Sequence, residues 1–375
     1  MKILLPYLQQ NSHYAELEKK HFLNDVVTTG QSFFAKMIYK NFENVTLKFI
    51  DNIKVVNRKL SKEICNSIKQ EANEINADII ICNNFQSFIS GASIVDSNIP
   101  IMYVCHENRS SMSCVQHMLR LKQNNHSVFL VNEYQKNYYD AYSKRLNKQL
   151  IKFDGFVEPA YLEGEKPKIQ NEVEFDCMTI GRCSPKYKMP YRLKSLLKDT
   201  DFKTLLITNI KNIDSESEDG KLEYYEKNKH WDNCLFDIPH HEVMKNLSNT
   251  KTYFMTWENE TFGITGLEAL SRGVPLILNS RMTEDRQPPK RQNYKFPLHA
   301  SNIIPVNDGH CVNIMLNSKE ELIDAINKLK DIDRKEVQDM TWEKYTPQRW
   351  KGLLDNAIDK TLENFKSRRG GVLPI

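Results

Sequence analysis

Two glutamates and two glycines gather in one short segment, Glu260-Thr-Phe-Gly-Ile-Thr-Gly-Leu-Glu268. Gly263 and Gly266 allow a turn of backbone to approach a ligand closely, and a helix that begins there offers unpaired amides to a phosphate. Because Glu260 lies before this helix and Glu268 lies within it, the two carboxylates can reach opposite ends of one elongated ligand. An anion with a hydroxyl-rich group on each side fits this arrangement, and a nucleotide sugar is such a molecule.

The segment continues as a helix that ends and leads into a buried strand. Leu267 and Leu270 supply an apolar face, and Gly273 suits the left-handed position that follows a helix. The apolar run Val-Pro-Leu-Ile-Leu at residues 274–278 is typical of a buried strand. An ordinary amphipathic helix and strand with two solvated glutamates is the alternative interpretation.

The whole segment resembles the E-x7-E signature of retaining glycosyltransferases with the GT-B fold. The resemblance implies that Glu260 is a catalytic residue and that Phe262 and Gly263 also face the donor sugar. It implies that Glu268 binds the ribose of the nucleotide. The residues that would hold the diphosphate follow the first glycine, and they are Ile264, Thr265 and Gly266.

A basic element after a predicted strand could supply positive charge to a diphosphate leaving group. In GT-B enzymes side-chain cations can take this role where other folds use a metal ion. The sequence Ile180-Gly-Arg-Cys-Ser-Pro-Lys-Tyr-Lys188 resembles the family element G-R-x4-K, with Arg182 as its arginine. The usual lysine position falls on Tyr187; we favour Lys188 as a catalytic cation and keep Lys186 as a donor-binding residue. A basic loop after a strand is the alternative.

Other positions complete the site that the resemblance implies. His106 ends a strand, at a place where related enzymes contact the donor sugar or the acceptor, and Glu107 would orient the acceptor hydroxyl. Gly30 would lie in the N-terminal loop that admits the donor phosphate, and backbone groups of Ile238 would read the edge of the base. For His106 and Gly30, a structural role at the end of a strand or the start of a helix is the alternative.

No metal site is expected. His240 and His241 are neighbours in sequence and cannot easily chelate one ion, and no nearby Cys, His or Asp completes a set of ligands. We therefore predict transfer without a metal ion or other cofactor, and a nucleotide sugar, a UDP-sugar, as the co-substrate.

Short apolar runs alternate along the chain with helix-length amphipathic segments, which is typical of βα units and a mainly parallel sheet. The predicted strands of the first half are residues 3–5, 45–49, 78–82, 101–105, 128–131 and 151–153, with helices at 32–41 and 62–75. The predicted strands of the second half are residues 175–180, 203–208, 233–236, 252–255, 275–278 and 302–305. A capping box at Ser318 and Glu321 opens a later helix.

The predicted fold is α/β and of the GT-B type, with two doubly wound Rossmann-like domains that face a cleft. Ligands of such folds bind at the carboxyl ends of the strands. Residues 1–165 would form the acceptor-side domain and residues 166–345 the donor-binding domain, with a linker near 157–173. A C-terminal helix within 346–375 would cross back to the first domain.

The expected acceptor rests on a looser likeness to bacteriophage DNA α-glucosyltransferases, which modify 5-hydroxymethylcytosine in duplex DNA. The likeness includes His106-Glu-Asn-Arg-Ser, Gly181-Arg182 and Phe-Pro-Leu-His at 296–299. It implies basic residues that neutralise DNA phosphates around an extruded base. With Glu107, the predicted acceptor-binding residues are Arg109, Arg286, Lys290 and Arg291. A solvated basic surface is the alternative.

Two other functions stay open. One is a bacterial transferase that acts on a glycan or a lipid-linked saccharide, and the other is a non-catalytic GT-B protein that binds nucleotide sugars or DNA. The net charge of +4 forces neither a nucleic-acid nor a membrane partner. The eight cysteines form no C-x-x-C pair, and the chain shows neither a signal peptide nor a membrane span. We therefore expect a cytoplasmic protein, in the host bacterium if it is phage-encoded.

Overall fold

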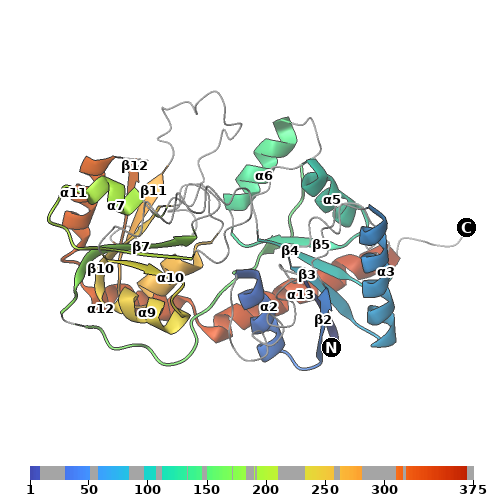
Figure 1. The fold of residues 1–375 in the computed structure, drawn as a ribbon. Helices are drawn as coiled ribbons and strands as arrows, with labels where there is room; N and C mark the ends of the chain where they lie inside the picture. Colours follow the sequence, from blue (N-terminus) through green and yellow to red (C-terminus); the bar gives the residue numbers. More distant parts are fainter. Residues whose placement is uncertain are drawn as a thin grey trace, which may run out of the picture. The chain divides into compact units, whose positions relative to one another are not determined.

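The structure is a computed structural model, and it divides the chain into two compact units. The first comprises Met1–Tyr161 and Pro347–Ile375, and the second comprises Leu162–Thr346. Each unit is built on a six-stranded sheet whose neighbouring strands all run parallel (Figure 1). The residues that the structure describes are 1–8, 30–50, 58–83, 97–106, 112–132, 134–145, 150–170, 172–182, 190, 192–209, 233–256, 262–280, 310–315 and 318–369.

The first sheet consists of strands that are mostly short, apolar and fully buried, as expected for a parallel sheet covered on both faces. In spatial order they are β2 (Val45–Ile50), β1 (Ile3–Leu8), β3 (Ile79–Asn83), β4 (Ile101–Cys105), β5 (Ser127–Leu130) and β6 (Gly155–Phe156). The described helices of this unit are α2 (Gly30–Asn41), α3 (Arg58–Glu74), α5 (Met112–Gln123), α6 (Tyr134–Arg145) and α13 (Pro347–Arg369). Figure 1 shows α2 and α13 on one face of the sheet and α5 and α6 on the other.

The second sheet has the same parallel pattern. In spatial order its strands are β12 (Cys311–Met315), β11 (Leu276–Ser280), β10 (Thr250–Met255), β7 (Phe175–Arg182), β8 (Thr204–Asn209) and β9 (Cys234–Phe236). Its described helices are α7 (Arg192–Leu197), α9 (His240–Ser248), α10 (Ile264–Leu270), α11 (Lys319–Leu329) and α12 (Arg334–Lys344). Figure 1 shows α7 and α11 on one face and α9, α10 and α12 on the other.

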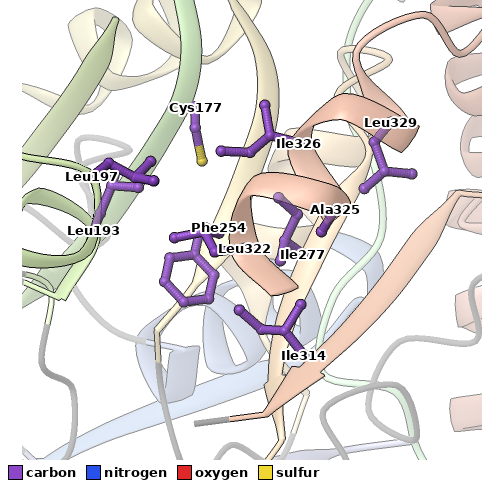
Figure 2. Close-up of a cluster of buried hydrophobic side chains, with 10 residues drawn as sticks. All are labelled: Cys177, Leu193, Leu197, Phe254, Ile277, Ile314, Leu322, Ala325, Ile326 and Leu329. Atoms are coloured by element: carbon purple, nitrogen blue, oxygen red, sulfur yellow. The ribbon is translucent and has the colours of Figure 1, made fainter. Parts of the chain in front are cut away.

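A hydrophobic cluster fixes α7 and α11 against the second sheet (Figure 2). Its members come from the two helices and from four strands, and they are Cys177, Leu193, Leu197, Phe254, Ile277, Ile314, Leu322, Ala325, Ile326 and Leu329. The helix α11 begins as its sequence predicts, because the Ser318 hydroxyl accepts a hydrogen bond from the Glu321 amide at 3.1 Å. The buried side chains of α11 recur every three or four residues, so one face of the helix enters the core.

One strand prediction was wrong, one was not tested, and one strand was not predicted. Residues 151–153 are not a strand: Ile151 is buried, but the amide of Asp154 donates to the Val128 carbonyl at 2.9 Å and pairing starts at Gly155. The prediction at 302–305 lies outside the described residues. Strand β12, which forms an edge of the second sheet, was not predicted, because the exposed Asn313 interrupts its apolar run.

The last helix, α13, belongs to the first unit. The buried carboxylate of Asp154 joins this helix to the first sheet. Asp154 accepts hydrogen bonds from Lys122 Nζ at 2.6 Å and from the Val128 amide at 2.8 Å. Asn364 of α13 donates to the same carboxylate at 2.9 Å and to the Ser127 hydroxyl at 2.9 Å. The C-terminal helix of the predicted fold is therefore present and is bound to the first sheet by polar contacts.

Candidate functional site

The order of the strands in the second sheet creates a point at which neighbouring connections diverge. Strand β8, which follows β7 in the chain, lies on one side of β7, whereas β10 and β11 lie on its other side. The helices α7 and α10 cover opposite faces of the sheet (Figure 1). In open α/β sheets such a switch point, at the carboxyl ends of the strands, is where ligands bind. Arg182 is the last residue of β7, and the helix that carries Glu268 follows β10.

The entry to α10 has the backbone geometry that its glycine allows. Gly263 has a φ of +75° and is the N-cap of the helix. Its carbonyl oxygen accepts from the amides of Gly266 at 2.9 Å and Leu267 at 3.1 Å. Since the first amides of a helix have no acceptor within the helix, the amides of Ile264 and Thr265 are the ones that helix geometry leaves for a ligand.

Two aromatic residues hold this entry in place. The ring of Phe262 is buried, with 3% exposure, and packs edge-on against Tyr345 with 6.1 Å between ring centroids. The hydroxyl of Tyr253 on β10 donates to the Thr265 hydroxyl at 3.0 Å and lies 3.4 Å from the Ile180 carbonyl oxygen on β7. Tyr253 thereby joins both strands of the switch point to the start of α10. Its place in an apolar strand gave no sign of this role.

Glu268 has a partner that the sequence analysis considered only as a metal ligand. Nε2 of His240, the first residue of α9, lies 2.7 Å from Oε1 of Glu268. The Glu268 side chain is 19% exposed, whereas that of His240 is 66% exposed. The hydrogen bond with Glu268 raises the pKa of His240 above its ordinary value, against partial burial and the nearby Arg272 charge, which lower it. Ile238, the predicted base-reading residue, is half-buried two residues before His240.

The other end of α10 is anchored by α12. The guanidinium of Arg334 donates to the carbonyl oxygens of Gly273 at 3.2 Å, Arg272 at 3.3 Å and Ser248 at 3.0 Å. A cation at the C-terminal ends of α9 and α10 is favourable because helix dipoles point their negative ends there. Trp342 adds a hydrogen bond from its indole to the Ser271 carbonyl at 2.9 Å. These contacts fix the helix that carries Glu268.

In the first unit the structure brings His106 and α2 together. His106 follows β4, is 8% exposed, and its ring meets that of Phe34 edge-on with 5.0 Å between centroids. Burial lowers the pKa of His106 to about 3, so its imidazole is neutral at physiological pH. A neutral imidazole offers a hydrogen bond to a hydroxyl without adding charge. Gly30 is the first residue of α2, two residues before the predicted start of this helix, and its contact with the donor phosphate stays a prediction.

Several predicted site residues lie outside the described residues. They are Glu260, Lys186, Lys188, Glu107, Arg109, Arg286, Lys290 and Arg291. Arg182 is placed only as the end of β7, since its side chain is not described. Within the described ranges, no three His, Cys, Asp or Glu side chains gather to hold a metal ion. Among the helices of these ranges, none combines the length and the hydropathy of a membrane-spanning segment.

Comparison with known proteins gives structural neighbours only. No protein-family model and no curated protein matches the sequence. HepE of Anabaena in complex with UDP-glucose is similar with a TM-score of 0.62 and 12% identity, over 96% of this chain and 100% of that chain. The lipopolysaccharide outer core galactosyltransferase WaaB has a TM-score of 0.54 and 14% identity, over 96% of this chain and 99% of that chain.

A third neighbour is longer than this chain. TarM has a TM-score of 0.53 and 14% identity, and the match covers 80% of this chain but only 57% of TarM. At these identities the likeness concerns the fold alone. The chain has two parallel-sheet Rossmann-like units and a C-terminal helix, and its similarity to these neighbours shows that it has the GT-B fold.

Proposed function

We propose that this protein is a glycosyltransferase that uses a nucleotide sugar, a UDP-sugar, as its donor. The observation that carries the proposal is the place of Glu268: its carboxylate lies on the helix that follows β10, at the switch point of the second sheet. A carboxylate can accept hydrogen bonds from both hydroxyls of a ribose. HepE, which shares the fold, is a UDP-glucose complex, and this supports the choice of uridine.

The remaining roles follow from the sequence motifs. The Ile264 and Thr265 amides would meet the diphosphate, and Arg182 with Lys188 would offset the charge that develops on it as it leaves. Glu260 would face the sugar and stabilise an oxocarbenium-like transition state. His106, neutral because it is buried, would contact a sugar or acceptor hydroxyl. Glu107 would orient the acceptor.

We propose further that transfer retains the anomeric configuration and needs no metal ion. The new glycosidic bond would form on the face of the sugar from which the nucleotide departs. The G-R element supports cationic stabilisation of the leaving group. NMR assignment of the product anomer tests retention, and an inverted product would contradict it. Activity that disappears in chelator and returns with a divalent cation would contradict metal independence.

For the acceptor we propose 5-hydroxymethylcytosine in duplex DNA, supported by the likeness to phage enzymes around His106 and by the basic residues at 286–291. A saccharide acceptor is the second candidate, and the similarity to the galactosyltransferase WaaB supports it. The two differ in salt dependence. A DNA acceptor contacted through phosphates should bind less tightly as salt rises, and a mispaired target base should react at least as readily as a paired one.

The experiment is a transfer assay that crosses donors with acceptors. The purified protein is incubated with labelled UDP-glucose, UDP-galactose or UDP-N-acetylglucosamine and with hydroxymethylated DNA, unmodified DNA or an oligosaccharide. We expect label on hydroxymethylated DNA alone. Label on the oligosaccharide alone would select the second candidate. Absence of transfer and of donor hydrolysis, with intact donor binding, would leave a non-catalytic binding protein.

A further inference from the structure

His240 and Glu268 come from different elements and meet at one point of the second unit. Nε2 of His240, at the start of α9, lies 2.7 Å from Oε1 of Glu268, which is in the middle of α10. The two residues are 28 positions apart in sequence, so only the packing of α9 against α10 brings them together. The contact uses one carboxylate oxygen of Glu268, and a carboxylate can accept several hydrogen bonds through its second oxygen.

The His240–Glu268 pair is more exposed than a contact that stabilises a protein core. The His240 side chain is 66% exposed, and an ion pair with so exposed a partner contributes little to folding stability. The α9 helix has other contacts for its attachment, such as the hydrogen bond from Arg272 Nε to the Met244 carbonyl at 3.1 Å. Contacts other than the His240–Glu268 hydrogen bond therefore also attach α9 to this region.

What the contact does fix is the orientation of the Glu268 carboxylate. A free glutamate side chain loses rotamer entropy when a ligand immobilises it, and this loss weakens binding. A hydrogen bond from His240 to one carboxylate oxygen restricts those rotamers before any ligand arrives. An acceptor that is already oriented binds a pair of hydroxyls more tightly than a mobile one.

We propose that His240 is a positioning residue that holds the Glu268 carboxylate for the ribose diol, and so makes the site selective for ribonucleotides over nucleotides that lack those hydroxyls. The proposal rests on the proposed function, in which Glu268 binds ribose. His240 acts through Glu268 and needs no contact with the reacting sugar. Its effect is therefore on affinity for the nucleotide and not on the chemical step.

The charges around the pair give the proposal a pH dependence. Among the described residues, Glu268 of α10 and Arg272, two residues after the end of α10, act electrostatically on His240: Glu268 favours the imidazolium and Arg272 opposes it. The imidazolium is a stronger donor to a carboxylate than neutral imidazole is. Selectivity for the ribose diol should accordingly be largest at pH values below the pKa of His240 and decline above it.

The experiment compares two probes by calorimetric titration of the wild type and of three variants at positions 240 and 241, with Glu268→Ala and its double variant with His240→Ala as a further pair. The probes are UDP and 2′,3′-dideoxy-UDP, whose phosphates titrate alike, so that their affinity ratio isolates the diol. The variants are His240→Ala, His240→Gln and the matched control His241→Ala. His241 is the adjacent residue, and its side chain is 77% exposed. Its Nε2 lies 3.6 Å from Oε1 of Glu242, so its carboxylate neighbour is Glu242.

We expect His240→Ala to weaken UDP binding about 2- to 5-fold, the range for a contact with an exposed partner, and to leave dideoxy-UDP binding unchanged. His240→Gln, whose amide can still donate, should recover part of the loss, and His241→Ala should match the wild type. In the wild type, the dissociation constant of dideoxy-UDP divided by that of UDP should fall as the pH rises from 6 to 8.5. In His240→Ala this ratio should not change with pH. Adding His240→Ala to Glu268→Ala should change nothing.

Other outcomes would overturn the inference in distinguishable ways. Equal losses for both probes, or no loss for either, would show that His240 does not act on the diol, while the proposed function would stand. A loss in His241→Ala as large as that in His240→Ala would point to the helix as a whole and would also overturn it. If the wild type binds neither UDP nor the diphosphates of the other common nucleosides, the proposed function fails and the inference fails with it.

Discussion

Gly273 and Arg334 share one small space at the end of α10: the carbonyl oxygen of Arg334 lies 2.2 Å from where a Cβ on Gly273 would sit. Gly273 also has a φ of +71°, a conformation that costs other residues about 1–2 kcal/mol. The guanidinium of Arg334 donates to the Gly273 carbonyl oxygen at 3.2 Å, so the two residues are held together. The turn that ends α10 therefore depends on glycine for two independent reasons.

Gly273→Ala should destabilise the protein by about 3 kcal/mol, because the methyl group meets a backbone oxygen that cannot move without shifting α12. Urea denaturation measures this. The matched control is Gly352→Ala in α13, where an added Cβ meets nothing within 4 Å and alanine favours the helix, so stability should stay equal or rise. Similar losses in both variants would contradict the argument from the Arg334 contact.

Removing the Tyr253 hydroxyl should loosen the start of α10. Tyr253→Phe loses the hydrogen bond to Thr265, 3.0 Å long, and should cost about 1 kcal/mol of unfolding free energy. Because the Thr265 amide is a predicted diphosphate ligand, UDP affinity should fall as well. Thr265→Val removes the other partner of the hydrogen bond. The double variant should have the same unfolding free energy as the less stable of the two single variants. Additive losses would show that the two hydroxyls act independently.

Asp154→Ala should weaken the attachment of α13 to the first sheet. The substitution removes the acceptor of Lys122 and of the Val128 amide, both of which are largely covered, and should cost about 3 kcal/mol. The control is Asp355→Ala on α13, because the Lys351 and Asp355 side chains of that ion pair are 45% and 43% exposed. This exposed pair should contribute less than about 0.5 kcal/mol to the unfolding free energy. Equal effects in chemical denaturation would contradict a special role for the buried carboxylate.

The pKa of His240 should lie above the ordinary histidine value and should return toward it in Glu268→Gln, as followed by NMR of the imidazole protons. A folded-state pKa above that of the unfolded chain stabilises the protein fully at pH values below the ordinary one. That contribution disappears as pH rises through the raised pKa. The wild type should therefore lose slightly more stability than Glu268→Gln over this interval. An unchanged His240 pKa in Glu268→Gln would rule out the carboxylate as the cause of the shift.

Substitutions of the two glutamates of the E-x7-E segment should affect different kinetic parameters. Glu268→Ala should mainly weaken donor binding, because it loses the ribose contact, and Glu260→Ala should mainly lower turnover, because its partner is the reacting sugar. Initial rates as a function of donor concentration give both quantities. Equal binding losses with unchanged turnover in the two variants would refute this division.

Much of the fold follows from local sequence signals, because those signals act within a few residues. Apolar runs at 3–5, 101–105 and 175–180 mark buried strands, since a parallel sheet covered on both faces needs continuous apolar side chains. The left-handed position at Gly273 and the Ser318 cap were predicted for the same reason, and both are confirmed. The local signal failed at 151–153, where burial of Ile151 occurs without strand pairing.

The details of the candidate site depend on contacts that spacing does not encode. Glu268 was predicted from its motif, whereas His240 was considered only as a metal ligand and was rejected in that role. Tyr253 and Arg334 drew no attention, because a tyrosine in a strand and an arginine at the start of a helix are ordinary there. Their partners lie 12 and 61 residues away, across α10. The amino-acid sequence by itself thus determined the elements and the motif residues. Only the tertiary structure, through the order of the strands and the faces on which the helices pack, decided which side chains meet.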